Sequence, residues 1–214
     1  MNVTIIDYGR SNLLSVCRAF EACGARVSVA STPEEAARAR ALVLPGVGAF
    51  GDGMQALRFL GLDEVLCEKA RTGTPLLGIC LGMQMLLDAS DEGGLHQGLG
   101  LVPGRVERIP AADVIGNPQP VPNIGWAPLL PAGGRADFAD TPFAGIRPRD
   151  ECYFVHGYEA KPASPEDVLA NTLYGGRAVC AAVARGNVVG CQFHPEKSAE
   201  AGLAVIGNFL KGIH

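Results

Sequence analysis

The stretch Pro75-Leu76-Leu77-Gly78-Ile79-Cys80-Leu81-Gly82 decides the fold. Residues 75–79 are apolar throughout, which predicts a parallel strand covered on both faces, and 82–88 predict a helix. Between them, Cys80 occupies the centre of a G-x-nucleophile-x-G pattern, with sulfur in place of a hydroxyl oxygen. Gly78 and Gly82 are the small neighbours that a tight strand-to-helix turn requires. The pattern predicts a nucleophilic thiol at the carboxyl end of the sheet, where open α/β sheets bind ligands, although an isolated cysteine is more often an inert core residue.

The segments before this stretch alternate between strand and helix. Apolar and cap patterns predict strands at Val3–Asp7, Arg26–Ala30 and Ala41–Leu44, and helices at Ser11–Cys23, Pro33–Ala39 and Met54–Arg71. Short strands that alternate with helices indicate an α/β fold, a doubly wound and mostly parallel sheet with helices on both faces.

The second half of the chain has a different pattern. From Asp91 onward glycine and proline are dense, and helical periodicity returns only in the predicted closing helix Ala199–Leu210. Strands are predicted at Val102–Ile109, Cys152–Glu159, Ala178–Ala184 and Val188–Phe193, the last two joined as a hairpin through 185–187. We therefore expect a more antiparallel second half within one domain, residues 1–214.

Composition excludes several classes of protein. Of 214 residues, 48% are hydrophobic and 19% are charged, which argues against a disordered chain. The net charge of −4 argues against binding to nucleic acid or to an anionic membrane. No apolar run is long enough to span a bilayer, and the N-terminus has no basic leader. The 7 cysteines include no CxxC pair, which favours reduced thiols over a metal or redox site. These features predict a cytoplasmic protein with no metal and no organic cofactor.

A base for the thiol is found at Phe193-His194-Pro195-Glu196, after the last predicted strand. Side chains two residues apart on extended chain point the same way, so Glu196 can reach His194. A carboxylate on one imidazole nitrogen leaves the other nitrogen free to take the thiol proton. By itself a His-x-Glu pair is more often a histidine and a glutamate on the surface. It indicates a catalytic site only together with Cys80.

An oxyanion site is predicted from the loop Pro45-Gly46-Val47-Gly48, which follows a strand at the same edge of the sheet. Its glycines allow a backbone N–H, from Val47 or Gly48, to turn toward a developing oxyanion, and the Leu81 N–H is the second expected donor. The same loop could switch one peptide between competent and incompetent orientations. The alternative is an ordinary strand-to-helix turn, which also favours proline and glycine.

Together, the 45–48 loop, the 78–84 segment and the 193–196 segment resemble the class I glutamine amidotransferases. Asp7-Tyr8-Gly9-Arg10-Ser11-Asn12-Leu13, Tyr153-Phe154-Val155-His156-Gly157-Tyr158 and Lys197-Ser198 resemble, within that family, the glutaminase subunit of imidazole glycerol phosphate synthase. The matching segments run from residue 4 to residue 198.

The resemblance implies a mechanism, a substrate and a partner. Cys80 would attack the amide of glutamine, His194 would act as base and then acid, and Glu196 would orient His194. Gln84 and the backbone at His156, Gly157 and Tyr158 would hold the glutamine. The partner would be a (β/α)8 synthase (cyclase) subunit, forming a heterodimer. It would receive ammonia through an internal channel and make imidazole glycerol phosphate and aminoimidazole carboxamide ribotide in histidine biosynthesis.

The chain departs from the family pattern at four positions outside the predicted triad, namely Ser11, Asn123, Ala127 and Gly157. These departures bear on partner docking and on glutamine contacts. Trp126, the only tryptophan, is either an interface anchor or a core aromatic residue. The other open interpretations are a glutaminase for a different synthase, a cysteine hydrolase that needs no partner, and a non-catalytic binding domain of the same fold.

Overall fold

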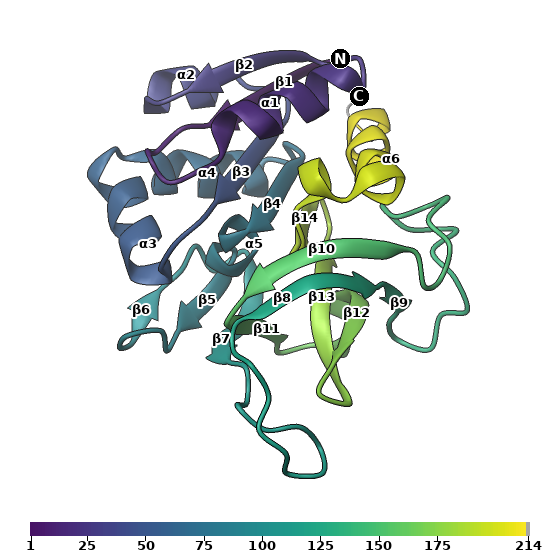
Figure 1. The fold of residues 1–214 in the computed structure, drawn as a ribbon. Coiled ribbons are helices and arrows are strands. Elements are labelled where there is room, and N and C mark those ends of the chain that lie inside the picture. Colours follow the sequence, from purple (N-terminus) through teal and green to yellow (C-terminus); the bar gives the residue numbers. More distant parts are fainter. Residues whose placement is uncertain (213–214) are drawn as a thin grey trace.

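The central sheet of the computed structural model, which describes residues 1–212, has eight strands in the order β2-β1-β3-β4-β14-β13-β12-β9 (Figure 1). Their bounds are β1 Asn2–Ile6, β2 Arg26–Ala30, β3 Leu42–Gly46, β4 Leu76–Cys80, β9 Leu130–Pro131, β12 Val168–Tyr174, β13 Arg177–Arg185 and β14 Val188–Cys191. The pairings from β2 to β14 are parallel, and those from β14 to β9 are antiparallel. The predicted α/β class with a more antiparallel second half is confirmed.

Helices cover both faces of this sheet, as predicted. Their bounds are α1 Leu13–Ala22, α2 Pro33–Ala37, α3 Phe50–Phe59, α4 Leu62–Arg71, α5 Leu81–Met85 and α6 Ala199–Lys211. Successive residues of β1 point to opposite faces, so Ile5 packs with α1 and α6 while Ile6 packs with α2, α3 and α4. The two resulting cores hold β4 between them and fix the position of its last residue, Cys80.

Two smaller sheets lie beside the main one. One pairs β8 (Asn123–Pro128) with β10 (Glu151–His156), and the other has the order β11-β7-β5-β6. Its strands are β5 Leu87–Ser90, β6 His96–Gln97, β7 Val102–Arg108 and β11 Tyr158–Pro162. Strands β5, β6, β8, β9 and β12 were absent from the sequence prediction.

Two predicted helices depart most from their observed bounds; the others differ by one or two residues at an end. The segment Met54–Arg71 contributes to two helices, α3 and α4, because Gly61 between them has the left-handed φ of 67° that interrupts a right-handed helix. The helix predicted over Gly82–Asp88 ends at Met85, because from Leu87 the backbone pairs with β7 instead. Helix α5 therefore has only 5 residues, so its dipole is weaker than that of the expected helix.

The single strand predicted over Cys152–Glu159 is two strands in two different sheets. Strand β10 ends at His156 and pairs with β8, whereas β11 begins at Tyr158 and pairs with β7. Gly157 is the junction, and a side chain there would lie 3.6 Å from Val121 and 3.8 Å from Pro122. This change of sheet brings the 156–158 backbone to the edge where β4 ends, as the pocket described below shows.

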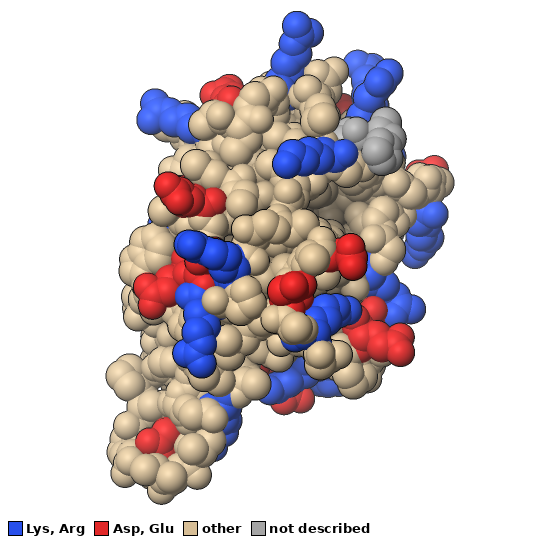
Figure 2. Space-filling view, turned by 90° about the vertical axis from the view of Figure 1, so that its right-hand side faces the viewer, with Lys and Arg blue, Asp and Glu red and all other residues tan. Residues whose placement is uncertain are grey.

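The surface carries charges of both signs. On the face drawn in Figure 2, Lys and Arg side chains are interspersed with Asp and Glu, and most of the area is uncharged. The segment between β7 and β8 projects from the body of the molecule as a long loop (Figure 1). Within residues 1–212, no helix combines the length and the hydrophobicity that crossing a membrane requires.

Candidate active site

Cys80 is the last residue of β4 and is held in a strained conformation, with φ of 54° and ψ of −111°. A positive φ is costly for a residue with a side chain, and such strain is concentrated at functional sites. The flanking glycines permit the turn. A side chain at Gly82 would lie 1.7 Å from the Leu44 carbonyl oxygen, and one at Gly78 would lie 2.8 Å from the Gly82 carbonyl oxygen. The turn therefore requires both glycines, as the sequence predicts.

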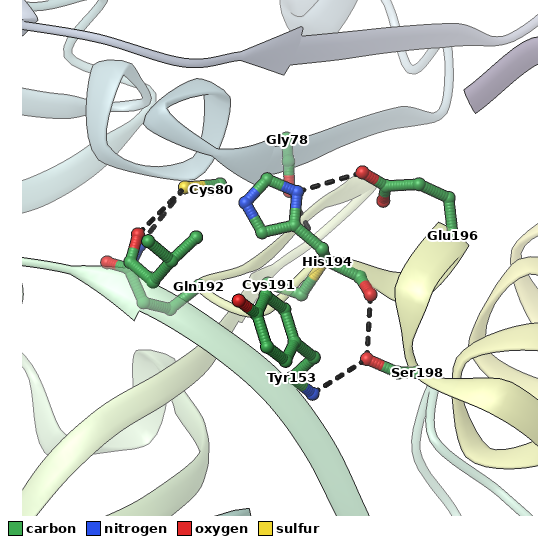
Figure 3. A network of polar contacts seen from close by, with 9 residues as sticks. Gly78, Cys80, Tyr153, Cys191, Gln192, His194, Glu196 and Ser198 are labelled. Atoms are coloured by element: carbon green, nitrogen blue, oxygen red, sulfur yellow. Dashed lines mark hydrogen bonds and ion pairs between the residues drawn. The ribbon is translucent and has the colours of Figure 1, made fainter. Parts of the chain in front are cut away.

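The imidazole of His194 lies between Cys80 and Glu196 (Figure 3). Its Nδ1 is 2.8 Å from Oε1 of Glu196, and only 4% and 1% of the two side chains are exposed. His194 follows β14, and Pro195–Lys197 forms a short 3₁₀ helix that returns Glu196 to the ring. The Ser198 hydroxyl donates to the His194 carbonyl at 2.6 Å and accepts from the Tyr153 N–H at 2.9 Å. This network fixes the ring from its backbone side.

The charge of His194 depends on its two neighbours. Burial by itself lowers the pKa of an imidazole, but the interactions with the Cys80 sulfur and the Glu196 carboxylate outweigh it and raise the pKa of His194 to about 9. The imidazolium is therefore the favoured form at neutral pH. Its Nε2 is buried and has no hydrogen-bond partner within residues 1–212. The ring in this form can hold on Nε2 the proton that Cys80 gives up.

The loop that follows β3 is packed tightly against the nucleophile turn. A side chain at Gly46 would lie 2.3 Å from the Tyr8 hydroxyl and 3.0 Å from Cβ of Leu81. The Tyr8 hydroxyl donates to the Pro45 carbonyl at 2.9 Å. Gly48 has the left-handed φ of 100°.

One expected oxyanion donor is engaged elsewhere. The Val47 N–H donates to the Arg10 carbonyl at 2.9 Å, because the 7–12 segment runs alongside the loop. In this conformation Val47 is not available as a donor, contrary to the sequence expectation. The described hydrogen bonds assign no acceptor to the N–H groups of Gly48 and Leu81.

A cavity of about 330 Å³ opens over Cys80. Nine of the ten residues predicted for the site line it: Val47, Gly48, Cys80, Leu81, Gln84, His156, Gly157, Tyr158 and His194. The tenth, Glu196, lies behind His194 and is not part of the lining. Segments that are distant in sequence thus meet at the carboxyl ends of β3, β4 and β14.

His156 is held as a neutral ring at the cavity wall. Burial is the main cause that lowers the pKa of His156 to about 4. Its Nδ1–H donates to the Tyr158 carbonyl at 2.8 Å, and its Nε2 accepts from the Asn123 side-chain amide at 3.3 Å. The Tyr158 carbonyl can only accept, so it fixes the tautomer of His156, and Asn123, one of the departures from the family pattern, donates to the remaining nitrogen.

Sequence reasoning missed several polar groups at the cavity. Among the described residues, Glu92 is the only acidic one in the cavity lining, and its carboxylate accepts from the Phe50 N–H at 2.8 Å. The Val155 carbonyl lies 4.0 Å from the Cys80 sulfur. Gln192 is fully buried and contacts both Gln84 and Cys80. Gln192 could have been predicted as a site residue because it lies two residues before His194. The sequence around Glu92 does not indicate that it reaches the cavity.

Comparisons with known proteins identify the family of the chain and structures of similar fold. Residues 4–213 match the family described as Glutamine amidotransferase class-I. The chain is 49% identical over 210 residues to imidazole glycerol phosphate synthase subunit HisH 1 of Legionella pneumophila, covering 98% of this chain and 99% of the relative. It is 44% identical over 208 residues to a HisH subunit of Geobacillus, covering 97% and 95%. By fold, it superposes on a chain of PurLQS from Thermotoga maritima with a TM-score of 0.76 at 21% identity, over 100% and 99% of the two chains.

Proposed function

This chain belongs to the class I glutamine amidotransferase family, among the HisH subunits of imidazole glycerol phosphate synthase, and on that basis we propose how its cavity releases ammonia from glutamine. The observation that carries the proposal is the convergence of Cys80, His194 and Glu196 at one cavity from two separate strands. The identities to HisH subunits set aside the alternative of a glutaminase that serves a different synthase.

The first half of the reaction is acyl transfer to sulfur. The Cys80 thiolate attacks the side-chain amide carbon of glutamine, and the thiol proton resides on Nε2 of His194. The negative charge that develops on the amide oxygen is stabilised by the N–H groups of Leu81 and Gly48, the donors nearest in sequence to the two tight turns. When the intermediate collapses, His194 gives its proton to the leaving nitrogen, and ammonia departs from the glutamyl thioester.

The second half regenerates the enzyme. A water molecule gives a proton to His194 and attacks the thioester carbon, and glutamate leaves as Cys80 recovers its proton. Glu196 touches no reacting atom. It keeps the proton of Nδ1 in place, so that Nε2 serves as base in one step and as acid in the next.

The cavity also has groups that suit the amino-acid end of glutamine. Glu92 is the only carboxylate of the lining and is placed to neutralise an α-ammonium group. The segment from His156 to Tyr158 lines the cavity at the junction between β10 and β11, so we propose that its backbone contacts the bound glutamine. We assign to Gln84 a contact with the bound glutamine.

The partner that takes the ammonia is proposed to dock on the outer face of β8 and β10. Trp126 and Ile124 are 52% and 61% exposed there and are two residues apart on β8, so both apolar side chains lie on one face of the strand. Trp126 packs edge-on against Tyr153 at 6.1 Å between ring centroids, and Lys197 lies 5.8 Å from the Tyr153 ring. Strand β10 also carries Val155 and His156 at the cavity. A (β/α)8 synthase subunit on this face would receive ammonia without its passage through water.

Docking would also complete the oxyanion site. In the present conformation the Val47 N–H is bound to the Arg10 carbonyl. With Val47 held by this bond, rotation of the Val47–Gly48 peptide, which the glycine permits, would turn the Gly48 N–H toward the oxyanion. We propose that the partner stabilises this rotated form, so that glutamine is hydrolysed chiefly when the ammonia can be used.

The remaining assignments follow from the same reasoning. We propose that residues 1–214 act as a single glutamine amidotransferase domain, because one sheet contains both β4 and β14. We also propose a cytoplasmic location, which suits seven free cysteines and a role in amino-acid biosynthesis.

The decisive experiment measures glutamate release from glutamine by the purified chain, alone and with a synthase barrel and its ribotide substrate. A low rate alone and a large increase with both additions would support the proposal. A high rate alone would indicate a free-standing amidase, and no rate under either condition would indicate a non-catalytic binding domain.

A further inference from the structure

Gln192 lies beneath the nucleophile and takes no part in the mechanism derived above. It follows β14 directly, its backbone N–H donates to the Ala181 carbonyl at 2.8 Å, and none of its surface is exposed. Its side-chain Nε2 is 3.8 Å from the Cys80 sulfur, a hydrogen-bond distance for a sulfur acceptor (Figure 3). A buried amide beside a reacting sulfur is placed to affect that sulfur as well as to fill space.

The direction of this contact is fixed by a chain of hydrogen bonds that starts at a carbonyl. The Tyr158 carbonyl can only accept, so Gln84 presents its Nε2 to it, at 3.1 Å. The second hydrogen of the same nitrogen is donated to Oε1 of Gln192 at 3.0 Å. Gln192 therefore has its oxygen toward Gln84 and its N–H group toward Cys80. The opposite orientation of either amide would bring two donors or two acceptors face to face.

The groups around the sulfur favour different protonation states. The Val155 carbonyl, at 4.0 Å, can only accept, so it pairs with the S–H group of a thiol. The Gln192 N–H can only donate, so it pairs with the sulfur lone pairs and most strongly with those of an anion. Loss of the thiol proton thus exchanges the contact with Val155 for a stronger contact with Gln192.

We propose that Gln192 is a positioning residue of the glutaminase reaction, which holds the Cys80 sulfur in its anionic form through a donor whose direction is set by Gln84 and Tyr158. This inference rests on the proposed role of Cys80 as the nucleophile. It also gives Gln84 a second task, because the amide of Gln84 orients Gln192 in addition to facing the cavity.

The test is the pH profile of Cys80 alkylation by iodoacetamide in the full chain, followed by mass spectrometry of the Cys80 peptide because six other thiols are free. Gln192→Met removes both hydrogen bonds at nearly constant size. Gln192→Glu keeps an acceptor for Gln84 and removes the donor to sulfur. Thr172→Val is the matched control, since Thr172 is fully buried in the same sheet and its hydroxyl has no partner within residues 1–212.

Both Gln192 variants are expected to shift the midpoint of the profile upward by about one pH unit, so that alkylation at pH values below the wild-type midpoint slows about tenfold. The Thr172→Val profile should coincide with that of the wild type, and thermal unfolding should verify that each variant is folded. A wild-type midpoint in either folded Gln192 variant overturns the inference while leaving the proposed function intact. If Cys80 of the wild type is not alkylated at any pH and the chain releases no glutamate, the inference about Gln192 and the proposed function are both refuted.

Discussion

Nδ1 of His194 lies 2.8 Å from Oε1 of Glu196, in a contact from which water is almost fully excluded. On the opposite side of the ring, Nε2 is buried and has no hydrogen-bond partner within residues 1–212. An ion pair of this kind is strong only because both groups are removed from solvent and held by the surrounding chain. The carboxylate fixes which nitrogen carries the permanent proton, and this in turn fixes which nitrogen meets the nucleophile.

The substitution Glu196→Gln should therefore weaken catalysis without abolishing it. We expect glutamate release to fall about 10²- to 10⁴-fold, because the imidazolium loses its counter-charge and the preference for one tautomer. The raised pKa of His194 depends in part on Glu196, so the high-pH limb of the rate profile should also move to lower pH. Steady-state rates between pH 5 and 10 provide the measurement, and an unchanged limb would refute this role of Glu196.

Removal of the nucleophile or of the base should separate the two reactions of the complex. Cys80→Ala and His194→Ala should each abolish glutamine-dependent synthesis when the chain is assembled with its synthase partner. Synthesis from added ammonium salt should continue at the wild-type rate, because the partner still binds its own substrate. Glutamine-dependent synthesis that survives in Cys80→Ala would mean that the nucleophile is wrongly assigned.

The oxyanion loop can be tested through its glycine. Gly48 has a φ of 100°, and a Cβ added there would meet no heavy atom within 4 Å, so Gly48→Ala strains the backbone without a steric clash. We expect the strain, of about 1–2 kcal/mol, to restrict the rotation of the Val47–Gly48 peptide and to lower both the basal and the partner-stimulated rates. The control is Gly73→Ala, at the end of α4, where φ is 89° and the surroundings are equally open.

In that pair of variants, Gly73→Ala should lose similar stability yet keep its glutaminase rate. If Gly48→Ala keeps both of its rates, the loop is an ordinary strand-to-helix turn.

Acid should destabilise the fold through His156. Its folded-state pKa of about 4 lies below the ordinary value of 6.5, so the native state prefers the neutral ring. The stability that this preference contributes is present above pH 6.5 and is lost as the pH falls through 4, and it amounts to roughly 3 kcal/mol. His194 has a raised pKa, so its own contribution is complete below pH 6.5 and does not cause this loss.

Urea unfolding at pH 7 and pH 4 measures the effect. In His156→Gln, which cannot titrate, the free energy of unfolding should fall less between these two pH values than in the wild type. An equal loss in both proteins would assign the acid sensitivity to other groups.

The docking face can be tested by truncation of its aromatic anchor. Trp126→Ala should raise the Kd for the synthase partner about tenfold or more, as expected for an exposed aromatic residue at the centre of an interface. Phe59→Ala is the matched control, because Phe59 is 88% exposed at the end of α3 and is not part of the β8–β10 face. Isothermal titration with the purified partner distinguishes them, and equal affinities for the two variants would place the interface elsewhere.

Much of the fold was determined by local sequence. The apolar strand before Cys80, the flanking glycines and the capped helix at Pro33 are decided by neighbours within a few residues, and the structure matches them. The three largest departures from the predicted elements have a common cause. At Gly61, Leu87 and Gly157 the path of the chain depends on a conformation or a pairing partner that periodicity does not encode.

Some features of the site also follow from local sequence, and others depend on the tertiary structure. Glycine spacing around Cys80 and the two-residue separation of His194 and Glu196 are local features, so the sequence by itself determined the nucleophile, the base and the orienting carboxylate as candidates. Only the tertiary structure decided that Glu92 reaches the cavity, that Gln192 contacts Cys80, that Val47 donates to Arg10, and that Asn123 donates to His156. Each of these contacts joins residues that are far apart along the chain, and burial and hydrogen-bond direction between such residues arise only when the sheets assemble.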